Sequence, residues 1–252
     1  MTEALHWHPV DWSIVGPALV AGLLVLATHV PLGLQVLRKG IVFIDLAVAQ
    51  IAGLGVLVAG LAGFEPHGWE VQVCAGSAAL AGAALLHWLE RRWPQSQEAL
   101  IGALFVVTSC VAILLLAGNP HGGEHLKDLL VGQILWVTPD QLWAMAALTA
   151  ALLLAWWRMP PRWAGAGFYV LFALAVTASV QLVGVYLVFS SLILPALAVQ
   201  RVPTTPRRLA HGFGLGALAY LCGLALSAML DLPSGALVVV VMAAVCLLGR
   251  AR

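Results

Sequence analysis

Nine apolar runs, separated by short polar segments, make up most of this chain. They cover residues 14–37, 41–62, 71–89, 99–117, 139–157, 164–182, 184–200, 209–230 and 235–249. Most of them approach the roughly 20 apolar residues with which one helix crosses the hydrocarbon layer of a membrane. Only 9% of the residues are charged, against roughly 25% in a soluble domain, and 62% are hydrophobic. The sequence therefore predicts an all-α polytopic membrane protein, with residues 1–252 forming a single transmembrane domain.

The distribution of Lys and Arg predicts the number of spans and their orientation. Eleven of the twelve cations follow every second run, and only Lys127 lies on the opposite side. The eleven are Arg38, Lys39, Arg91, Arg92, Arg158, Arg162, Arg201, Arg207, Arg208, Arg250 and Arg252. Nine spans, with an external N-terminus and a cytoplasmic C-terminus, place all eleven in the cytoplasm, as the positive-inside rule favours. Eight spans are the alternative, because the runs 164–182 and 184–200 are almost continuous, with "VQLVGVY" as a tight turn or break between them.

The segments on the predicted external side are rich in histidine and carboxylate. Among them are His67, His121, Glu124 and His125. Imidazole and carboxylate are ligands that suit zinc, manganese and iron, although any one histidine in a short loop is more often simply a polar surface residue. As a set, these four residues predict an external mouth that concentrates divalent cations. The net charge of +1 provides no basic field for nucleic acid.

His29, Asp45 and Gln50 are polar residues that lie inside the first two apolar runs. Ionisable groups in a membrane span are costly, so they are functional candidates by default. Pro31 should kink the first helix and expose a backbone carbonyl beside His29. Two other interpretations remain open: an ion pair of Asp45 with Arg38 or Lys39, and a purely structural bond from His29 to a backbone carbonyl.

Several common motifs are missing from the chain. There is no Gly-Lys dipeptide, so no Walker A phosphate loop can form, and any ATP that the protein depends on is bound by another chain. Neither HExxH nor GxSxG occurs, which gives an intramembrane protease little support. Gly212 and Gly216 form a GxxxG pattern, which indicates close helix packing rather than chemistry.

Three segments resemble the membrane permease of the bacterial zinc/manganese/iron ABC importers. They are "LRKGIVFIDLAVAQIAGLG" (37–55), "HGGEHLKDLLVGQILWV" (121–137) followed by "TPDQL", and "VGVYLVFSSLILPALAVQRVPTTPRRLA" (183–210). They occur in the order expected of that family. The resemblance implies a multi-pass protein of the bacterial inner membrane that is not itself an enzyme, with a divalent metal ion as substrate and no permanently bound cofactor.

The resemblance also implies partners and roles. Such permeases form homodimers within the membrane lipid, bind cytoplasmic ATPase subunits that carry the ATP, and receive metal from an external binding protein. The segment after the seventh run resembles the ATPase-coupling region, which here contains Gln200, Arg201, Arg207 and Arg208. The segment 129–137 is expected to dip back toward the membrane before the fifth span.

The second span departs from the commoner family pattern Gly-Asp-x-Leu-x-His. In "FIDLAVAQ", Gln50 stands where the histidine would be, and Asp45 lies five residues before it. An amide oxygen is a harder ligand than imidazole, which favours manganese slightly over zinc, while His29 could restore a nitrogen ligand. Two rival functions remain: an ion-coupled secondary metal transporter without an ATPase, and a membrane scaffold with no transport activity.

Overall fold

The computed structural model describes residues 11–65, 68–116 and 132–249, and the regular secondary structure of these ranges is entirely helical. The α-helices are α1 (Trp12–Lys39), α2 (Ile44–Leu61), α3 (Trp69–Arg92), α4 (Gln97–Leu116), α6 (Pro139–Arg158), α7 (Ala164–Val183), α8 (Val185–Ala198), α9 (Thr205–Leu230) and α10 (Ser234–Leu248). Short 3-10 turns are η1 (Pro94–Ser96), η2 (Ile134–Trp136) and η3 (Pro161–Trp163). The predicted all-α class is confirmed, with one helix for each apolar run within the described ranges.

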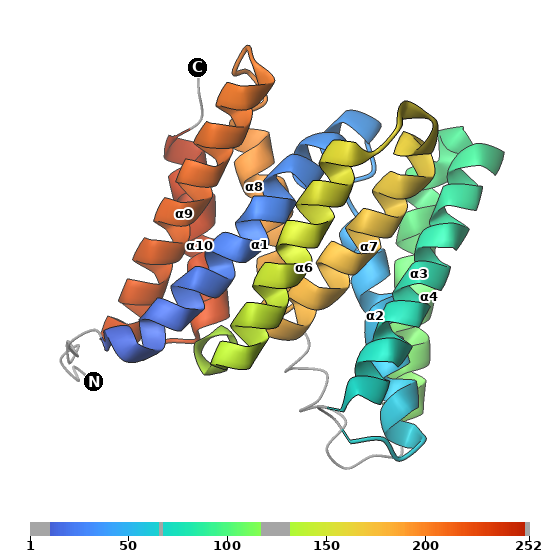
Figure 1. Cartoon of the computed structure of the whole chain (residues 1–252), viewed down its shortest axis with the longest axis horizontal. Helices are drawn as coiled ribbons and strands as arrows, with labels where there is room; N and C mark the ends of the chain where they lie inside the picture. The colour runs from blue at the N-terminus through green and yellow to red at the C-terminus, as the bar shows by residue number, and fades with distance from the viewer. Residues whose placement is uncertain (1–10, 66–67, 117–131, 250–252) are drawn as a thin grey trace, which may run out of the picture.

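Six helices of the described ranges are long and apolar enough to cross a membrane. They are α1, α2, α3, α9, α4 with the preceding η1, and α7 with the preceding η3. Helices α8 and α10 are apolar but shorter. Successive helices run in opposite directions, so the C-terminal ends of α1, α3, α6 and α10 lie at one end of the bundle, the upper end in Figure 1. The last turns of α1, α3 and α6 carry Arg or Lys, which gathers cations at that end.

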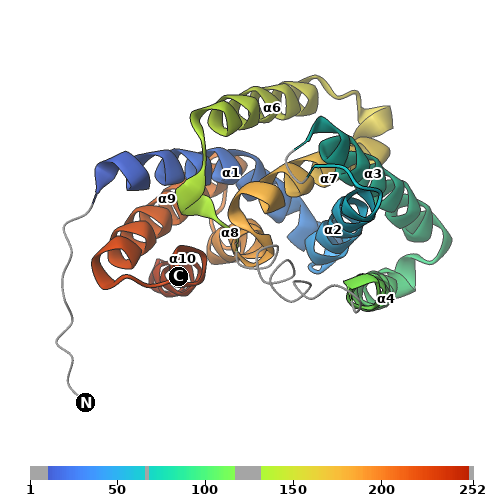
Figure 2. The same ribbon diagram turned by 90° about the horizontal axis from the view of Figure 1, so that it is seen from below.

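The helices form two groups that meet along α7 (Figures 1 and 2). One group contains α1, α8, α9 and α10, and the other contains α2, α3, α4 and α7. Helix α6 lies across the outside and packs on α1 and α7. Although α1 and α2 are consecutive in the chain, each packs mainly against helices of its own group.

Glycines allow α1 and α9 to approach closely. A Cβ on Gly216 would lie 2.6 Å from a methyl carbon of Leu26, and one on Gly212 would lie 3.0 Å from Val30. Gly22 of α1 in turn faces the ring of Tyr220 on α9, and a Cβ on Gly22 would lie only 2.3 Å from a carbon of that ring. The GxxxG pattern is therefore a helix-packing feature, as its sequence predicts.

Helices α7 and α8 are separated by a single residue, Gly184, whose φ of 83° is one that non-glycine residues rarely adopt. The break predicted within "VQLVGVY" is confirmed. Gly132, with φ 70°, lies against it so closely that a Cβ there would be 2.2 Å from the carbonyl carbon of Val183. The following η2 contacts α1 and α10, and its Ile134 is buried, so residues 134–136 pack against the bundle before α6. Residues 129–131 lie outside the described ranges, and the predicted dip of residues 129–137 toward the membrane stays a prediction.

Candidate functional site

His29 is fully buried in the middle of α1, two residues before Pro31. Its Nδ1 lies 2.9 Å from the carbonyl oxygen of Val25 and 3.1 Å from the hydroxyl of Thr28, which itself donates to the same carbonyl. A neutral imidazole that donates from Nδ1 to Val25 carries a lone pair on Nε2. That Nε2 is buried and has no hydrogen-bond partner among the described residues. The backbone bond expected for a structural histidine is thus present, but it orients the ring and leaves the second nitrogen free to act as a ligand.

Asp45 is the second residue of α2 and is 1% exposed. The alternative interpretation as an ion-pair partner of Arg38 or Lys39 is wrong, because Lys39 pairs with Glu90 and no ion pair in the described ranges includes Asp45. Its Oδ1 is buried and has no hydrogen-bond partner in the same ranges. A buried carboxylate without a counter-charge is unfavourable unless it serves a function, so Asp45 is the leading candidate for a cation-binding side chain.

Gln50 lies one and a half turns further along α2 and is half-buried. No hydrogen bond of the described ranges joins Gln50, Asp45 and His29, and no group of three or more His, Cys, Asp or Glu side chains there is close enough to hold a metal ion. His29 and Asp45 also belong to different helix groups. Their convergence on one ion therefore stays a prediction.

The external mouth predicted from His67, His121, Glu124 and His125 lies outside the described residues and also stays a prediction. Five described carboxylates flank the helices at the end opposite the cations: Asp11, Glu65, Glu70, Asp140 and Asp231. Asp11 caps α1, accepting from the Ser13 hydroxyl at 2.7 Å and from the Ser13 amide at 2.9 Å, and these two bonds lower the pKa of the Asp11 carboxyl. The described part of this end therefore presents several acidic side chains.

The segment proposed for coupling to an ATPase forms a folded elbow between α8 and α9. Gln200, Arg201 and Arg207 are exposed. Arg208 is half-buried, and its Nε donates to the carbonyl oxygen of Val202. Val202 packs in a small core cluster with Leu34, Ala196 and Val199. Arg208 thus holds the elbow together, a difference from Arg207 that two adjacent arginines in a sequence do not reveal.

Pro195 lies inside α8, which continues to Ala198. Helix α8 therefore does not end at this proline. The elbow begins at the turn from Val199 to Val202, in which the Val202 amide donates to the Val199 carbonyl at 3.1 Å.

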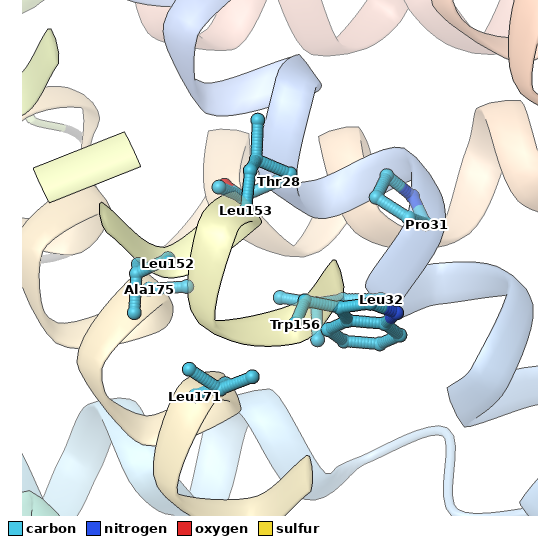
Figure 3. A pocket seen from close by; sticks show the side chains of 8 residues that line it. All are labelled: Thr28, Pro31, Leu32, Leu152, Leu153, Trp156, Leu171 and Ala175. Carbon is cyan, nitrogen blue, oxygen red and sulfur yellow. The ribbon is translucent and has the colours of Figure 1, made fainter. Parts of the chain in front are cut away.

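A small cavity lies between α1, α6 and α7 (Figure 3). It is lined by Thr28, Pro31, Leu32, Leu152, Leu153, Trp156, Leu171 and Ala175. The indole of Trp156 lies beside Leu32, and the only polar side-chain atom that is not aromatic is the Thr28 hydroxyl, which is bonded to Val25. Such a lining offers no metal ligand, so the cavity is a packing defect beside the proline of α1 rather than part of an ion path.

The long apolar helices define a multi-pass helical membrane protein, and the buried His29 and Asp45 are of the kind found in transporters. The chain matches the ABC 3 transport family over residues 11–160 and 157–252, and it belongs to this family. It is therefore the membrane permease subunit of an ABC transporter, and it is not itself catalytic.

Similar proteins span almost the whole chain. An uncharacterized membrane protein of Synechocystis sp., slr2045, is 28% identical over 96% of this chain and 91% of its own length. The manganese transport system membrane protein MntC of Halalkalibacterium halodurans is 23% identical over 92% of this chain and 84% of its own. The solved structure of PsaBC from Streptococcus pneumoniae in complex with Fab superposes with a TM-score of 0.75 at 20% identity, covering 94% of this chain and 90% of that one, which shows the shared fold.

Proposed function

We propose that this permease belongs to an importer that moves a divalent transition metal, zinc, manganese or iron, from the exterior or periplasm into the cytoplasm. One observation carries the proposal. In this transporter subunit, the Asp45 carboxylate is buried and has no counter-ion among the described residues. The name of the Halalkalibacterium relative supports a metal substrate and favours manganese.

Asp45, His29 and Gln50 supply the ligands of the path in this proposal. A divalent cation that enters the hydrocarbon layer must exchange hydration waters for fixed oxygen or nitrogen atoms. The Asp45 carboxylate offsets part of the charge, and the free Nε2 of His29 and the amide oxygen of Gln50 contribute neutral ligands. One anionic ligand rather than several keeps binding reversible, as passage requires.

The proposed orientation has the N-terminus outside and the C-terminus in the cytoplasm, with nine spans. Two observations support it. Among the described residues, the cations lie at one end of the bundle and the exposed acids at the other. Exposed tryptophans also lie near both ends of the helices, as in the aromatic belts of membrane proteins. Trp12, Trp69, Trp136 and Trp143 lie at the acidic end, and Trp88, Trp93, Trp157 and Trp163 at the basic end.

The partners follow from the same orientation. The elbow containing Gln200, Arg201, Arg207 and Arg208 faces the cytoplasm, where an ATP-binding-cassette ATPase supplies the ATP site. The acidic end faces an external metal-binding protein, and a second copy of the permease completes the complex in the bacterial inner membrane.

Asp45→Asn tests the function directly, because it keeps the side-chain shape and removes the charge. The variant, assembled with its ATPase and binding protein in proteoliposomes, should lose metal uptake by about tenfold or more while still inserting and hydrolysing ATP. Asp140→Asn, an exposed acid in the first turn of α6, is the matched control and should transport normally. Uptake that persists without ATP would instead support an ion-coupled carrier, and normal uptake by Asp45→Asn would refute the role of this residue.

A further inference from the structure

The connection between α1 and α2 leads directly to Asp45. It consists of residues 40–43, after which Ile44 and Asp45 open α2. The N-cap position of α2 is Phe43, whose side chain makes no capping hydrogen bond. The first amides of a helix need acceptors from outside the helix, so something else must hold this end.

Glu98 of α4 supplies that acceptor from 55 positions along the chain. Its Oε1 accepts from the backbone amide of Phe43 at 3.3 Å. A carboxylate at this position also interacts favourably with the positive end of the α2 dipole. Helix α4 packs almost entirely on α2, so the cap and the helix contact reinforce each other.

A second glutamate holds the other end of the connection. Lys39, the last residue of α1, forms an ion pair with Glu90 at the end of α3. Its Nζ also lies 5.4 Å from the ring centre of Phe168 and 5.5 Å from that of Tyr169, within the range of a cation–π interaction. Tyr169 is fixed in turn, since its hydroxyl accepts from Nε2 of Gln97 at 2.7 Å.

Glu90 and Glu98 flank the turn between α3 and α4. They bind the two ends of the connection that precedes Asp45, Glu90 through Lys39 and Glu98 through the Phe43 amide. We infer that Glu98 is a positioning residue for transport: together with Glu90 it fixes where α2 begins, and so where the Asp45 carboxylate lies. This inference rests on the proposed role of Asp45. Glu98 itself does not touch the ion; it acts through the Phe43 amide.

Hydrogen exchange tests, independently of transport, whether Glu98 holds the start of α2. In the complete transporter, reconstituted in nanodiscs, Glu98→Ala should speed amide exchange several-fold in peptides covering residues 42–46, because the Phe43 amide loses its acceptor and the start of α2 is no longer held. Glu98→Gln keeps an acceptor oxygen and should remain protected. Asp140→Ala is the control, because α6 has its own cap in Thr138 and Gln141. Unchanged exchange in Glu98→Ala would overturn the inference.

Transport tests the consequence. Glu98→Ala should lower the maximal rate of manganese or zinc uptake by about tenfold, because a small displacement of a fixed ligand has a large effect on rate. The KM for the metal-loaded binding protein should stay the same, and Glu98→Gln should keep most of the rate. Faster exchange with an unchanged uptake rate would show a cap that does not position Asp45, and would also overturn the inference.

A local cap provides the rescue. Phe43 is 47% exposed, so Phe43→Asn can be introduced without emptying the core, and asparagine is among the preferred N-cap residues. The double variant Phe43→Asn/Glu98→Ala should regain both exchange protection and uptake, including the case in which Glu98→Ala alone assembles poorly. The asparagine side chain would accept from the amides of residues 45 and 46, so a double variant that regains protection there but not uptake would contradict the positioning role. If Asp45→Asn transports normally, the proposed role of Asp45 in the metal path fails, while the exchange result still decides whether Glu98 caps α2.

Discussion

At the residue scale, His29 and Asp45 differ in how the protein holds them. The His29 ring is oriented by the contacts of its Nδ1 with the Val25 carbonyl and the Thr28 hydroxyl. The position of Asp45 depends instead on where α2 begins, and there Glu98 accepts from the Phe43 amide. Burying both side chains is costly, because Nε2 of His29 and Oδ1 of Asp45 have no hydrogen-bond partners among the described residues. Both unpaired atoms are of the kinds that bind divalent transition metals.

His29 variants can separate the two ring nitrogens. His29→Asn retains a polar atom near the position of Nδ1, so the bond to Val25 and the fold should persist, but the ligand atom at Nε2 is lost and metal uptake should fall by about tenfold. His29→Gln places its amide nearer to the position of Nε2 and should retain more uptake. Uptake assays on variants of equal expression provide the measurement, and wild-type uptake by His29→Asn would mean that the ring is structural.

At the element scale, the elbow between α8 and α9 contains two adjacent arginines with different surroundings. Arg207 is exposed at the basic end, whereas Arg208 is bonded to the Val202 carbonyl and shapes the turn. An exposed cation is suited to contact a partner, and a hydrogen-bonded one to keep the contact surface in shape.

Arg207→Glu should therefore uncouple ATP hydrolysis from metal uptake while leaving the melting temperature of the permease unchanged. Arg208→Ala should lower that temperature, because it removes the partly buried hydrogen bond to the Val202 carbonyl, at a cost of about 1 kcal/mol. Thermal unfolding in detergent and coupled ATPase assays in liposomes measure the two effects. The reverse assignment would follow if Arg207→Glu destabilised the protein and Arg208→Ala transported poorly at full stability.

At the scale of the whole molecule, two helix groups meet along α7, and the proposed path residues are divided between them. His29 belongs to the group of α1, α8, α9 and α10, which also carries the elbow, and Asp45 belongs to the other. The Lys39–Glu90 ion pair joins the two groups at the basic end. A relative movement of the groups would thus change the distance between the two candidate ligands.

Labelling single cysteines tests the orientation of the bundle. In a background without Cys74, Cys110, Cys222 and Cys246, a membrane-impermeant maleimide on intact cells should label Asp231→Cys, which lies at the acidic end. Gln95→Cys, in the turn between α3 and α4, should react only after permeabilisation. Labelling of Gln95→Cys from outside would invert the proposed topology, because the hydrocarbon layer separates the two ends completely.

Several features of this protein could be predicted from the order of its residues alone. The nine helices of the described ranges, the break within "VQLVGVY", the close packing at Gly212 and Gly216, and the burial of His29 and Asp45 were all predictable. The reason is that a membrane imposes simple linear rules: each span needs a minimum apolar length, cations prefer one side, and an isolated polar group within a span is exceptional.

The partners of those residues were decided only by tertiary structure. Sequence proximity suggested Lys39 for Asp45, yet Lys39 pairs with Glu90, and Glu98 caps α2 from 55 positions away. Likewise α1 and α2 are neighbours in the chain but pack in different groups. A hydrogen bond or ion pair depends on a few ångströms of separation, and those distances are set by how distant helices pack on one another, which no local pattern encodes.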